Sequence, residues 1–248
     1  MKARHLMRWV LLGIVALFSI AEPNPLLSRP WPAVATGFTP DKGKLRILQQ
    51  GMEAGTEEFS FAPAGNGWMM EDETTIHVPG SGEMRTSGQL RISADGAPQH
   101  YTWNAQSDKK ASGVVDFENG TAKTSITLSG TKQPVRQDFT FSSAQIAVLD
   151  NNLYEQYAII GRIYDWNAKG AQSFSVLIPQ DATPGTVDVE SLGPKNVDGA
   201  NLELLRVHST DLEIELYFDL KFHLIRLEVP AAKVVILRQS GSPAVTTR

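Results

Sequence analysis

The stretch NNLYEQYAIIGRIYDW, residues 151–166, decides the fold. A stripe of large side chains recurs in it three to four positions apart, which is the spacing of an amphipathic helix. The stripe consists of Leu153, Tyr157, Ile160 and Tyr164. Most of the remaining chain alternates apolar and polar residues in steps of two, the spacing of β-strands. The sequence therefore predicts a single helix that lies against a β-sheet.

Signals at both ends of this stretch set the limits of the predicted helix. Asn152 can cap the first turn, and Glu155 follows three residues later, which is the arrangement of a capping box. Gly170 lies a little beyond the last periodic residue, where a glycine commonly ends a helix. We therefore expect a helix from about Asn152 to Trp166, with its apolar stripe buried against the sheet.

Short alternating segments on both sides of the helix predict antiparallel strands. The apolar pairs are Ile76 and Val78, Leu90 and Ile92, Tyr101 and Trp103, Val115 and Phe117, Ile126 and Leu128, and Phe139 and Phe141. Turn sequences such as ENG (118–120) separate them, so sequential neighbours should pair as hairpins. Polar residues alternate with the apolar ones, which indicates a sheet with one face in water. The predicted fold is mainly β: a curved antiparallel sheet of about ten strands, a half-barrel, with one covering α-helix.

The amino-terminal residues have the pattern of an export signal. The basic segment MKARHLMR precedes the apolar run WVLLGIVALFSIA, which is short for a bilayer span. Ser19 and Ala21 have the spacing of a cleavage site before Glu22. The predicted organisation is a signal peptide over 1–21, a proline-rich extended arm over 22–43, a single β-rich domain over 44–238 and a flexible tail over 239–248. The alternative for the first segment is an uncleaved membrane anchor.

Charge and cysteine content limit the classes of partner and compartment. Removing the signal peptide with Lys2, Arg4 and Arg8 leaves 20 basic against 27 acidic residues, a net charge near −7. Such a surface argues against nucleic acid and anionic lipid as partners. The chain has no cysteine, so its core must hold the fold without disulfides. We predict a bacterial periplasmic or secreted protein with no stable membrane span after signal removal; the oligomeric state is left open.

A motif near the start of the predicted domain carries a resemblance. Gly51, Gly55, Thr56 and Glu57 form a Gly-x-x-x-Gly-Thr-Glu segment, and SFSVLIPQ (173–180) and YFDLKFHLIRLEVP (217–230) follow the helix. In this order the segments resemble uncharacterised secreted bacterial domains, and their layout is similar to the lipoprotein-carrier (LolA/LppX-like) half-barrel. The resemblance implies a curved antiparallel sheet around a helix, with an apolar cavity that accommodates acyl chains in the periplasm.

No motif of a known enzyme chemistry occurs in the sequence. The chain lacks a glycine-rich phosphate loop, a nucleophile elbow and a His-Glu-x-x-His metal motif. The histidines of the mature chain have no second ligand at metal-binding spacing, so no metal, cofactor or catalytic residue is predicted. Glu213 and Glu215 share one strand face, as two catalytic carboxylates could, although a solvated edge strand has the same pattern.

Large aromatic side chains are the candidates for lining a cavity. Trp103, Tyr157 and Tyr164, with Ile160, are the predicted ligand-binding residues; the alternative is that they fill the core. The predicted function is that of a non-enzymatic cell-envelope protein that binds an apolar or lipid-like ligand, or an envelope partner, in the concave face of its sheet. Two alternatives stay open: a carboxylate-dependent hydrolase acting on an envelope polysaccharide or ester, and an adaptor whose exposed strand edge adds to another chain.

Overall fold

The computed structural model describes residues 38–239, apart from positions 79, 81, 108, 169 and 211. The predicted signal peptide, most of the predicted arm and nearly all of the predicted tail lie outside the described residues. The first strand begins at Asp41, inside the stretch that was expected to be an arm. Within the described part, every helix is too short or too polar to cross a membrane.

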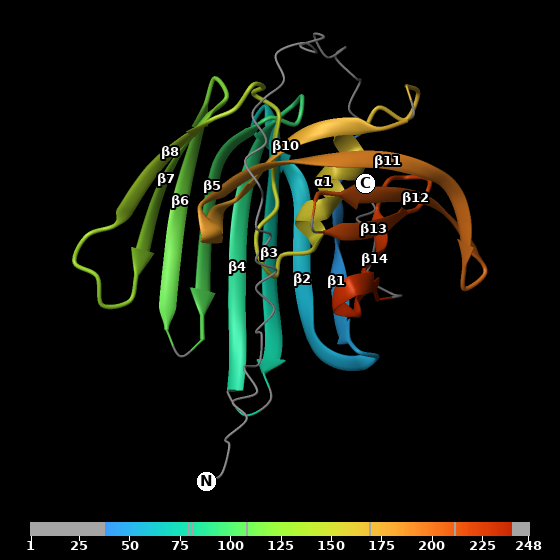
Figure 1. The fold of residues 1–248 in the computed structure, drawn as a ribbon, viewed down its shortest axis with the longest axis horizontal. Helices are drawn as coiled ribbons and strands as arrows, with labels where there is room; N and C mark the ends of the chain where they lie inside the picture. The colour runs from blue at the N-terminus through green and yellow to red at the C-terminus, as the bar shows by residue number, and fades with distance from the viewer. Residues whose placement is uncertain are drawn as a thin grey trace.

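The described residues form one large open sheet (Figure 1). Its strands are β1 (Asp41–Gln49), β2 (Met52–Ala64), β3 (Gly67–Val78), β4 (Gly82–Ser93), β5 (Pro98–Gln106), β6 (Lys110–Glu118), β7 (Thr121–Leu128), β8 (Val135–Thr140), β9 (Ile146–Val148), β10 (Gln172–Ile178), β11 (Thr183–Val197), β12 (Ala200–His208), β13 (Glu213–Phe218), β14 (Leu224–Val229) and β15 (Val234–Arg238). Helix α1 (Ala158–Ile163) and the 3-10 turns η1 (Glu155–Tyr157), η2 (Pro179–Asp181) and η3 (Pro230–Ala232) complete the elements.

The strand order follows from two meanders. It runs β8-β7-β6-β5-β4-β3-β2-β1-β15-β14-β13-β12-β11-β10-β9, so that the first and last of the described strands pair at the centre of the sheet. All neighbours are antiparallel except β9 and β10, which are parallel. The predicted Asn119-Gly120 hairpin turn is confirmed, because both residues have positive φ, as a two-residue turn between twisted strands requires.

The sheet curls strongly and packs against itself. Strand β9 lies against β5, and η2 lies against β6, so the sheet approaches closure through side-chain packing without hydrogen bonds between its two ends. Strands β6–β8 extend past this contact; they are called the wing below and lie at the left of Figure 1. We call the face that carries the core the inner face of the sheet and the opposite face the outer face.

The predicted helix is present inside the curl, but it is shorter than expected. A 3-10 turn, Glu155–Tyr157, leads into α1, which ends at Ile163. The predicted cap at Asn152 is wrong, because that residue has φ of 62° and no side chain of the segment caps the helix. All six residues of α1 are buried, including Arg162, so the helix is enclosed and has no solvated face.

The expected number of about ten strands is also wrong, since the described sheet has fifteen. Polar residues on the inner face obscured the alternation of β2 and β3, where Glu57, Asp72 and Thr74 are buried. Strand β9 has only three residues, all buried, so it shows no alternation. Strand β15 is a short run, VVILR, whose apolar residues are nearly continuous.

The helix approaches β13 as closely as a glycine permits. A Cβ atom on Gly161 would lie 2.5 Å from Cε1 and Cζ of Phe218, well inside van der Waals contact. Phe218 is itself completely buried, so it cannot move aside into solvent. The contact therefore fixes the depth at which α1 sits in the curl.

Gly161→Ala should destabilise the protein by about 1–3 kcal/mol because the added methyl overpacks this contact. The loss should appear even though alanine favours helices over glycine by about 1 kcal/mol. Denaturant unfolding measures it. The double variant Gly161→Ala/Phe218→Leu should recover part of the loss, since leucine vacates the space of the ring. A single variant as stable as the parent would show that the contact is loose.

Candidate functional site

Four buried carboxyl groups surround the start of the helix inside the curl. We call Glu57, Asp72, Asp150 and Glu155 the interior acid cluster; each is at most 3% exposed. Glu57 and Asp72 point inward from β2 and β3, while Asp150 and Glu155 lie on the segment that follows β9. Carboxyl groups in such surroundings must be hydrogen-bonded, paired or protonated.

Glu57 anchors the start of the helix to the sheet. Its carboxylate accepts the backbone N–H of Tyr154 at 2.8 Å and that of Glu155 at 2.9 Å. A residue distant in the sequence thus serves the role that was predicted for Asn152. Burial raises the pKa of Glu57 to about 7, in spite of these two hydrogen bonds, which act in the opposite direction.

Asp150 ties the same segment to β5 and η2. Its carboxylate accepts the hydroxyl of Tyr101 at 2.8 Å and the backbone N–H of Gln180 at 2.9 Å. The side chain of Gln156 joins this group to Asp72: its oxygen accepts the Asp150 N–H, and its amide nitrogen lies 3.4 Å from an Asp72 carboxylate oxygen. Burial raises the pKa of Asp150 to about 6 and that of Asp72 well above its usual range.

Two arginines compensate part of the buried negative charge. Arg162 of α1 lies 3.5 Å from Asp41 and 3.8 Å from Glu155, with its guanidinium 4.1 Å from the ring centre of Phe61. Arg238 of β15 binds the same Asp41. Burial lowers the pKa of Arg162 and raises that of Glu155. The charge of Arg162 thus lies between Asp41 of β1 and Glu155, without a hydrogen bond from its terminal nitrogens to any described residue, while Arg238 binds Asp41 from β15.

The interior acid cluster is closed to solvent, and its carboxyl groups anchor the start of the helix to the sheet. Its carboxyl groups cannot reach a substrate without opening of the fold. No group of three or more His, Asp or Glu side chains among the described residues has the arrangement of a metal site. The chemistry available here is proton uptake coupled to folding.

The four predicted ligand-binding residues do not form one open cavity. Ile160 and Tyr164 are buried, and the Tyr164 hydroxyl donates to the carbonyl of Gly170 at 2.7 Å. Trp103 is buried with its ring over Gly113, whereas Tyr157 is half-buried on η1. The structure thus places three of them in the core, and their assignment to ligand binding stays a prediction.

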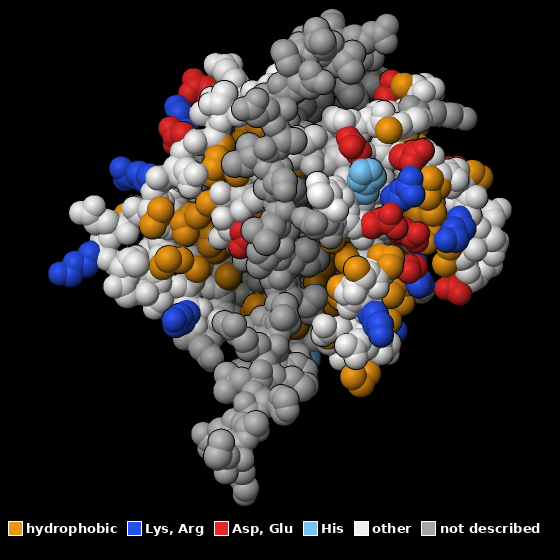
Figure 2. All heavy atoms as spheres, viewed as in Figure 1, with side chains coloured by type: hydrophobic (Ala, Val, Ile, Leu, Met, Phe, Trp, Pro, Cys, Tyr) orange, Lys and Arg blue, Asp and Glu red, His pale blue; other side chains and the backbone are white. Residues whose placement is uncertain are grey.

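An apolar surface that the prediction did not include lies on the inner face of the wing. We call Ala111, Ile126, Leu128 and Val135 the apolar wing surface. Leu128 is 45% and Val135 56% exposed, while the other two are half-buried. Register places Leu128 opposite Ala111 and Val135 opposite Ile126, so all four share one face. Figure 2 shows hydrophobic side chains gathered over β6–β8 on this side of the molecule.

One row of cross-strand neighbours joins this surface to the interior. It runs from β3 to β8 through Asp72, Gly88, Trp103, Gly113, Ile126 and Val135. Gly88 leaves room for Leu153 and Gln156, and Gly113 leaves room for the indole of Trp103. Trp103 therefore separates the filled part of the curl from the apolar wing surface. The indole N–H has no hydrogen-bond partner among the described residues.

The outer face carries a polar groove of about 480 Å³ across β2–β5. Its lining is formed by Glu58, Phe59, Ser60, Glu71, Asp72, Glu73, Ser87, Gly88, Gln89, Thr102 and Asn104. Glu58 lies directly opposite Glu73, and Gln89 donates to Glu71 at 3.2 Å. Lys44 pairs with Glu58 at 3.0 Å. The groove is thus lined mainly by carboxylate, amide and hydroxyl groups that water reaches.

The carboxylate pair singled out in the sequence has ordinary strand partners. Glu213 lies opposite His208, and Glu215 lies opposite Arg206 and accepts the hydroxyl of Tyr217. Three histidines each have a carboxylate neighbour, namely Glu83 for His77, Asp116 for His100 and Asp219 for His223.

Comparison with known proteins places the fold among bacterial β-rich domains. No protein-family model and no curated protein matches the chain. It is similar to a crystal structure of a beta-barrel-like protein of the domain of unknown function DUF1849 from Brucella abortus, with a TM-score of 0.53 and 10% identity over 82% of this chain and 95% of that one. A DUF1089 family protein from Pseudomonas aeruginosa gives 0.42 and 11% over 71% and 89%. The first likeness shows the fold alone.

The stability of the protein should fall as pH rises from 5 to 8. Folding raises the pKa of Glu57 from 4.5 to about 7. The protonated carboxyl therefore stabilises the folded state fully below pH 4.5, and this contribution is lost as the pH rises through about 7. Glu57 alone accounts for a change on the order of 3 kcal/mol. Denaturant unfolding at a series of pH values measures this slope.

Glu57→Gln should flatten the slope, because an amide does not titrate. The matched control is Glu58→Gln, one residue along on the solvated face of β2, which should leave the slope unchanged. Equal slopes in the parent and in Glu57→Gln would show that the buried carboxyl does not govern the pH dependence.

Proposed function

We propose that this chain is a non-enzymatic periplasmic or secreted cell-envelope protein that binds an apolar or lipid-like ligand at the apolar wing surface. The proposal rests on one observation. Leu128 and Val135 are each about half exposed on the concave side of the sheet, although the apolar residues of this face are elsewhere buried in the core. An acyl chain lying across β6–β8 would remove this surface from water.

The interior of the curl favours this location over the one predicted from sequence. Helix α1 and the aromatic side chains around it occupy the curl, and Ile160 and Tyr164 are buried there. On the wing the same inner face continues past the contact of η2 with β6 and ends in the exposed side chains of Leu128 and Val135. A ligand would therefore lie beside Trp103, whose free indole N–H supplies one hydrogen-bond donor to a polar group of the ligand.

The envelope location rests on the amino-terminal sequence. Its basic and apolar segments have the pattern of an export signal, and the chain has no cysteine. The likeness to bacterial β-rich domains is compatible with this location. The lipid-carrier layout inferred from the sequence supports the class of ligand, and it stays part of the proposal.

Titration with a long-chain fatty acid and an environment-sensitive dye tests the proposal. The parent protein should bind saturably, and Leu128→Glu/Val135→Glu should raise the dissociation constant about tenfold or more, because binding would then bury charge. The matched control is Val114→Glu, which changes an exposed apolar residue on the opposite face of β6 and should bind like the parent. Absence of saturable binding, or equal weakening in the control, would refute the proposal.

A second candidate function is favoured by the outer groove. Glu58 and Glu73 lie directly opposite each other on neighbouring strands, with Cβ atoms about 5 Å apart, so their flexible side chains can bring the two carboxyl groups to the separation of about 5 Å that retaining glycosidases use. An envelope polysaccharide would fit a groove of this polarity.

Hydrolysis of bacterial envelope polysaccharide by the purified chain tests this second function. Glu73→Gln should reduce the rate about 100-fold or more, whereas Glu53→Gln, a carboxylate of the same sheet that pairs with Arg46, should not. Absence of product with the parent protein would exclude the hydrolase.

A further inference from the structure

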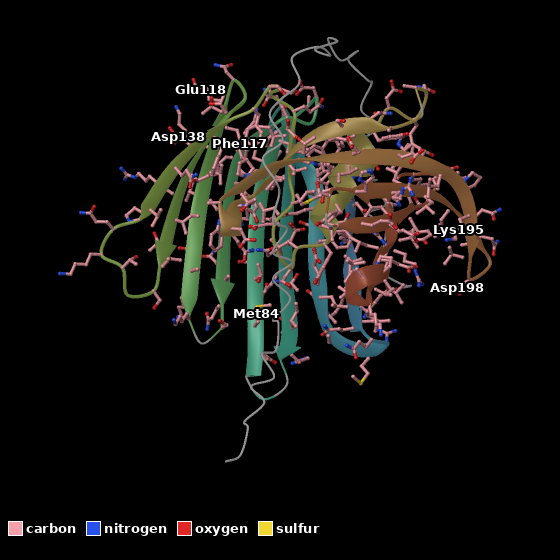
Figure 3. All side chains as sticks on the ribbon, viewed as in Figure 1. Met84, Phe117, Glu118, Asp138, Lys195 and Asp198 are labelled. Carbon is pink, nitrogen blue, oxygen red and sulfur yellow. The ribbon has the colours of Figure 1, made fainter. Side chains whose placement is uncertain are left out.

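The two ends of the sheet differ in how they are protected. At one end β9 has three buried residues and lies against β5. At the other end β8 has six residues, five of them exposed, and β7 is its only strand neighbour in the described part of the chain. Figure 3 shows Asp138 on this outermost strand, away from the curl. Strand β8 is therefore an open edge available for pairing.

The backbone groups of β8 that face outward can be assigned. The Phe141 N–H donates to the Gly120 carbonyl at 2.8 Å, on the β7 side. Since consecutive residues of a strand direct their N–H and C=O to opposite sides, the groups of Val135, Gln137 and Phe139 point to β7, and those of Arg136, Asp138 and Thr140 point away. The register with β7 has no bulge, and Pro134, which precedes the strand, limits the open edge to the outward groups of Arg136, Asp138 and Thr140.

The side chains of β8 are complementary to those of a second copy in one register. In an antiparallel pair centred on Gln137, each Arg136 lies opposite the other copy's Asp138, and each Val135 lies opposite the other copy's Phe139. Centring on Arg136 or on Asp138 would set like charges opposite each other. Centring between two residues would set outward backbone groups against inward ones, which forms no ladder.

We propose that two copies of this chain associate through their β8 strands, paired antiparallel about a two-fold axis at Gln137. The interface is the same surface on both copies, so the assembly closes as a dimer. Backbone hydrogen bonds of Arg136 and Asp138 continue the sheet, and their side chains form two ion pairs on the outer face. On the inner face the half-exposed Val135 meets the other copy's Phe139, and the two wings form one continuous surface.

Charge exchange tests the register by sedimentation velocity over a range of protein concentrations. The parent should show a monomer–dimer equilibrium. Arg136→Asp and Asp138→Arg should each raise the dissociation constant about tenfold or more, because each sets like charges opposite one another twice. An equimolar mixture of the two variants should recover the dimer as a heterodimer, and the double variant Arg136→Asp/Asp138→Arg should recover it alone. Arg91→Asp, an exposed charge change on the outer face of β4, should leave the equilibrium unchanged.

A single introduced cysteine tests the axis, since the chain has no other thiol. Gln137 would face its own copy in a pair without backbone hydrogen bonds, where Cα atoms lie about 4.5 Å apart, within the range that a disulfide spans. Gln137→Cys should therefore form a disulfide-linked dimer on mild oxidation. Thr140→Cys, exposed on the same strand but remote from its own copy in this register, should stay monomeric under reducing-agent-free denaturing electrophoresis.

Each outcome decides the proposal. Dimerisation that is lost in both single charge variants and regained in their mixture supports it, as does selective cross-linking at position 137. A parent that stays monomeric at its highest soluble concentration overturns it, as does a dimer that neither charge variant weakens. Equal cross-linking at positions 137 and 140 indicates random collision and overturns the register. Circular dichroism of each variant verifies that it is folded.

Discussion

The acceptance of two backbone N–H groups by the buried carboxylate of Glu57 is the interaction on which the interior depends. The start of the helix has no capping side chain of its own, and its N–H groups lie where water does not reach. If either N–H group had no partner, the folded state would be destabilised by a free energy comparable to that of a lost hydrogen bond. A single side chain from β2 satisfies both and thereby fixes where η1 and α1 begin relative to the sheet.

The remaining polar groups of the interior extend this constraint in two directions. Asp150, Tyr101 and Gln156 attach the segment before the helix to β5, and Arg162 attaches the helix itself to β1 through Asp41. Buried networks of this kind add little to net stability, because desolvation offsets most of the attraction. Their contribution is to select one docking geometry, since any other leaves charges unpaired. The curl is therefore filled in a unique way, whereas the inner face of the wing keeps apolar side chains that are partly in contact with water.

The sequence predicted the class of the fold and the enclosed helix, because both depend on periodicity. Alternation revealed the hairpins of β4–β7, and the Asn-Gly pair between β6 and β7 gave its turn directly. Periodicity gives no signal where polar side chains face inward, as Glu57 of β2 and Asp72 of β3 do, and Asn152 with Glu155 resembled a cap that does not form. The apolar wing surface was missed for a related reason. Ile126, Leu128 and Val135 follow the strand pattern of the core, and only the curl of the sheet shows that the filled region ends before them. The large aromatic residues were predicted to contact a ligand because of their size, but large size favours burial in the core as strongly as it favours ligand contact.

The pairing of β1 with β15 brings together residues from the two ends of the described chain. Among the described strands, the one that completes the centre of the sheet is therefore the last to be synthesised, and Arg238, the partner of Asp41, comes with it. Until β15 pairs with them, β1 and β14 each have one unpaired edge, and the position between these two edges is open to water. The native structure therefore forms late, after β15 becomes available. Contacts such as that between β1 and β15 join residues far apart in the sequence, which is typical of proteins that fold slowly. A nascent chain of this kind gains from a chaperone that shields its central strands until β15 has been synthesised.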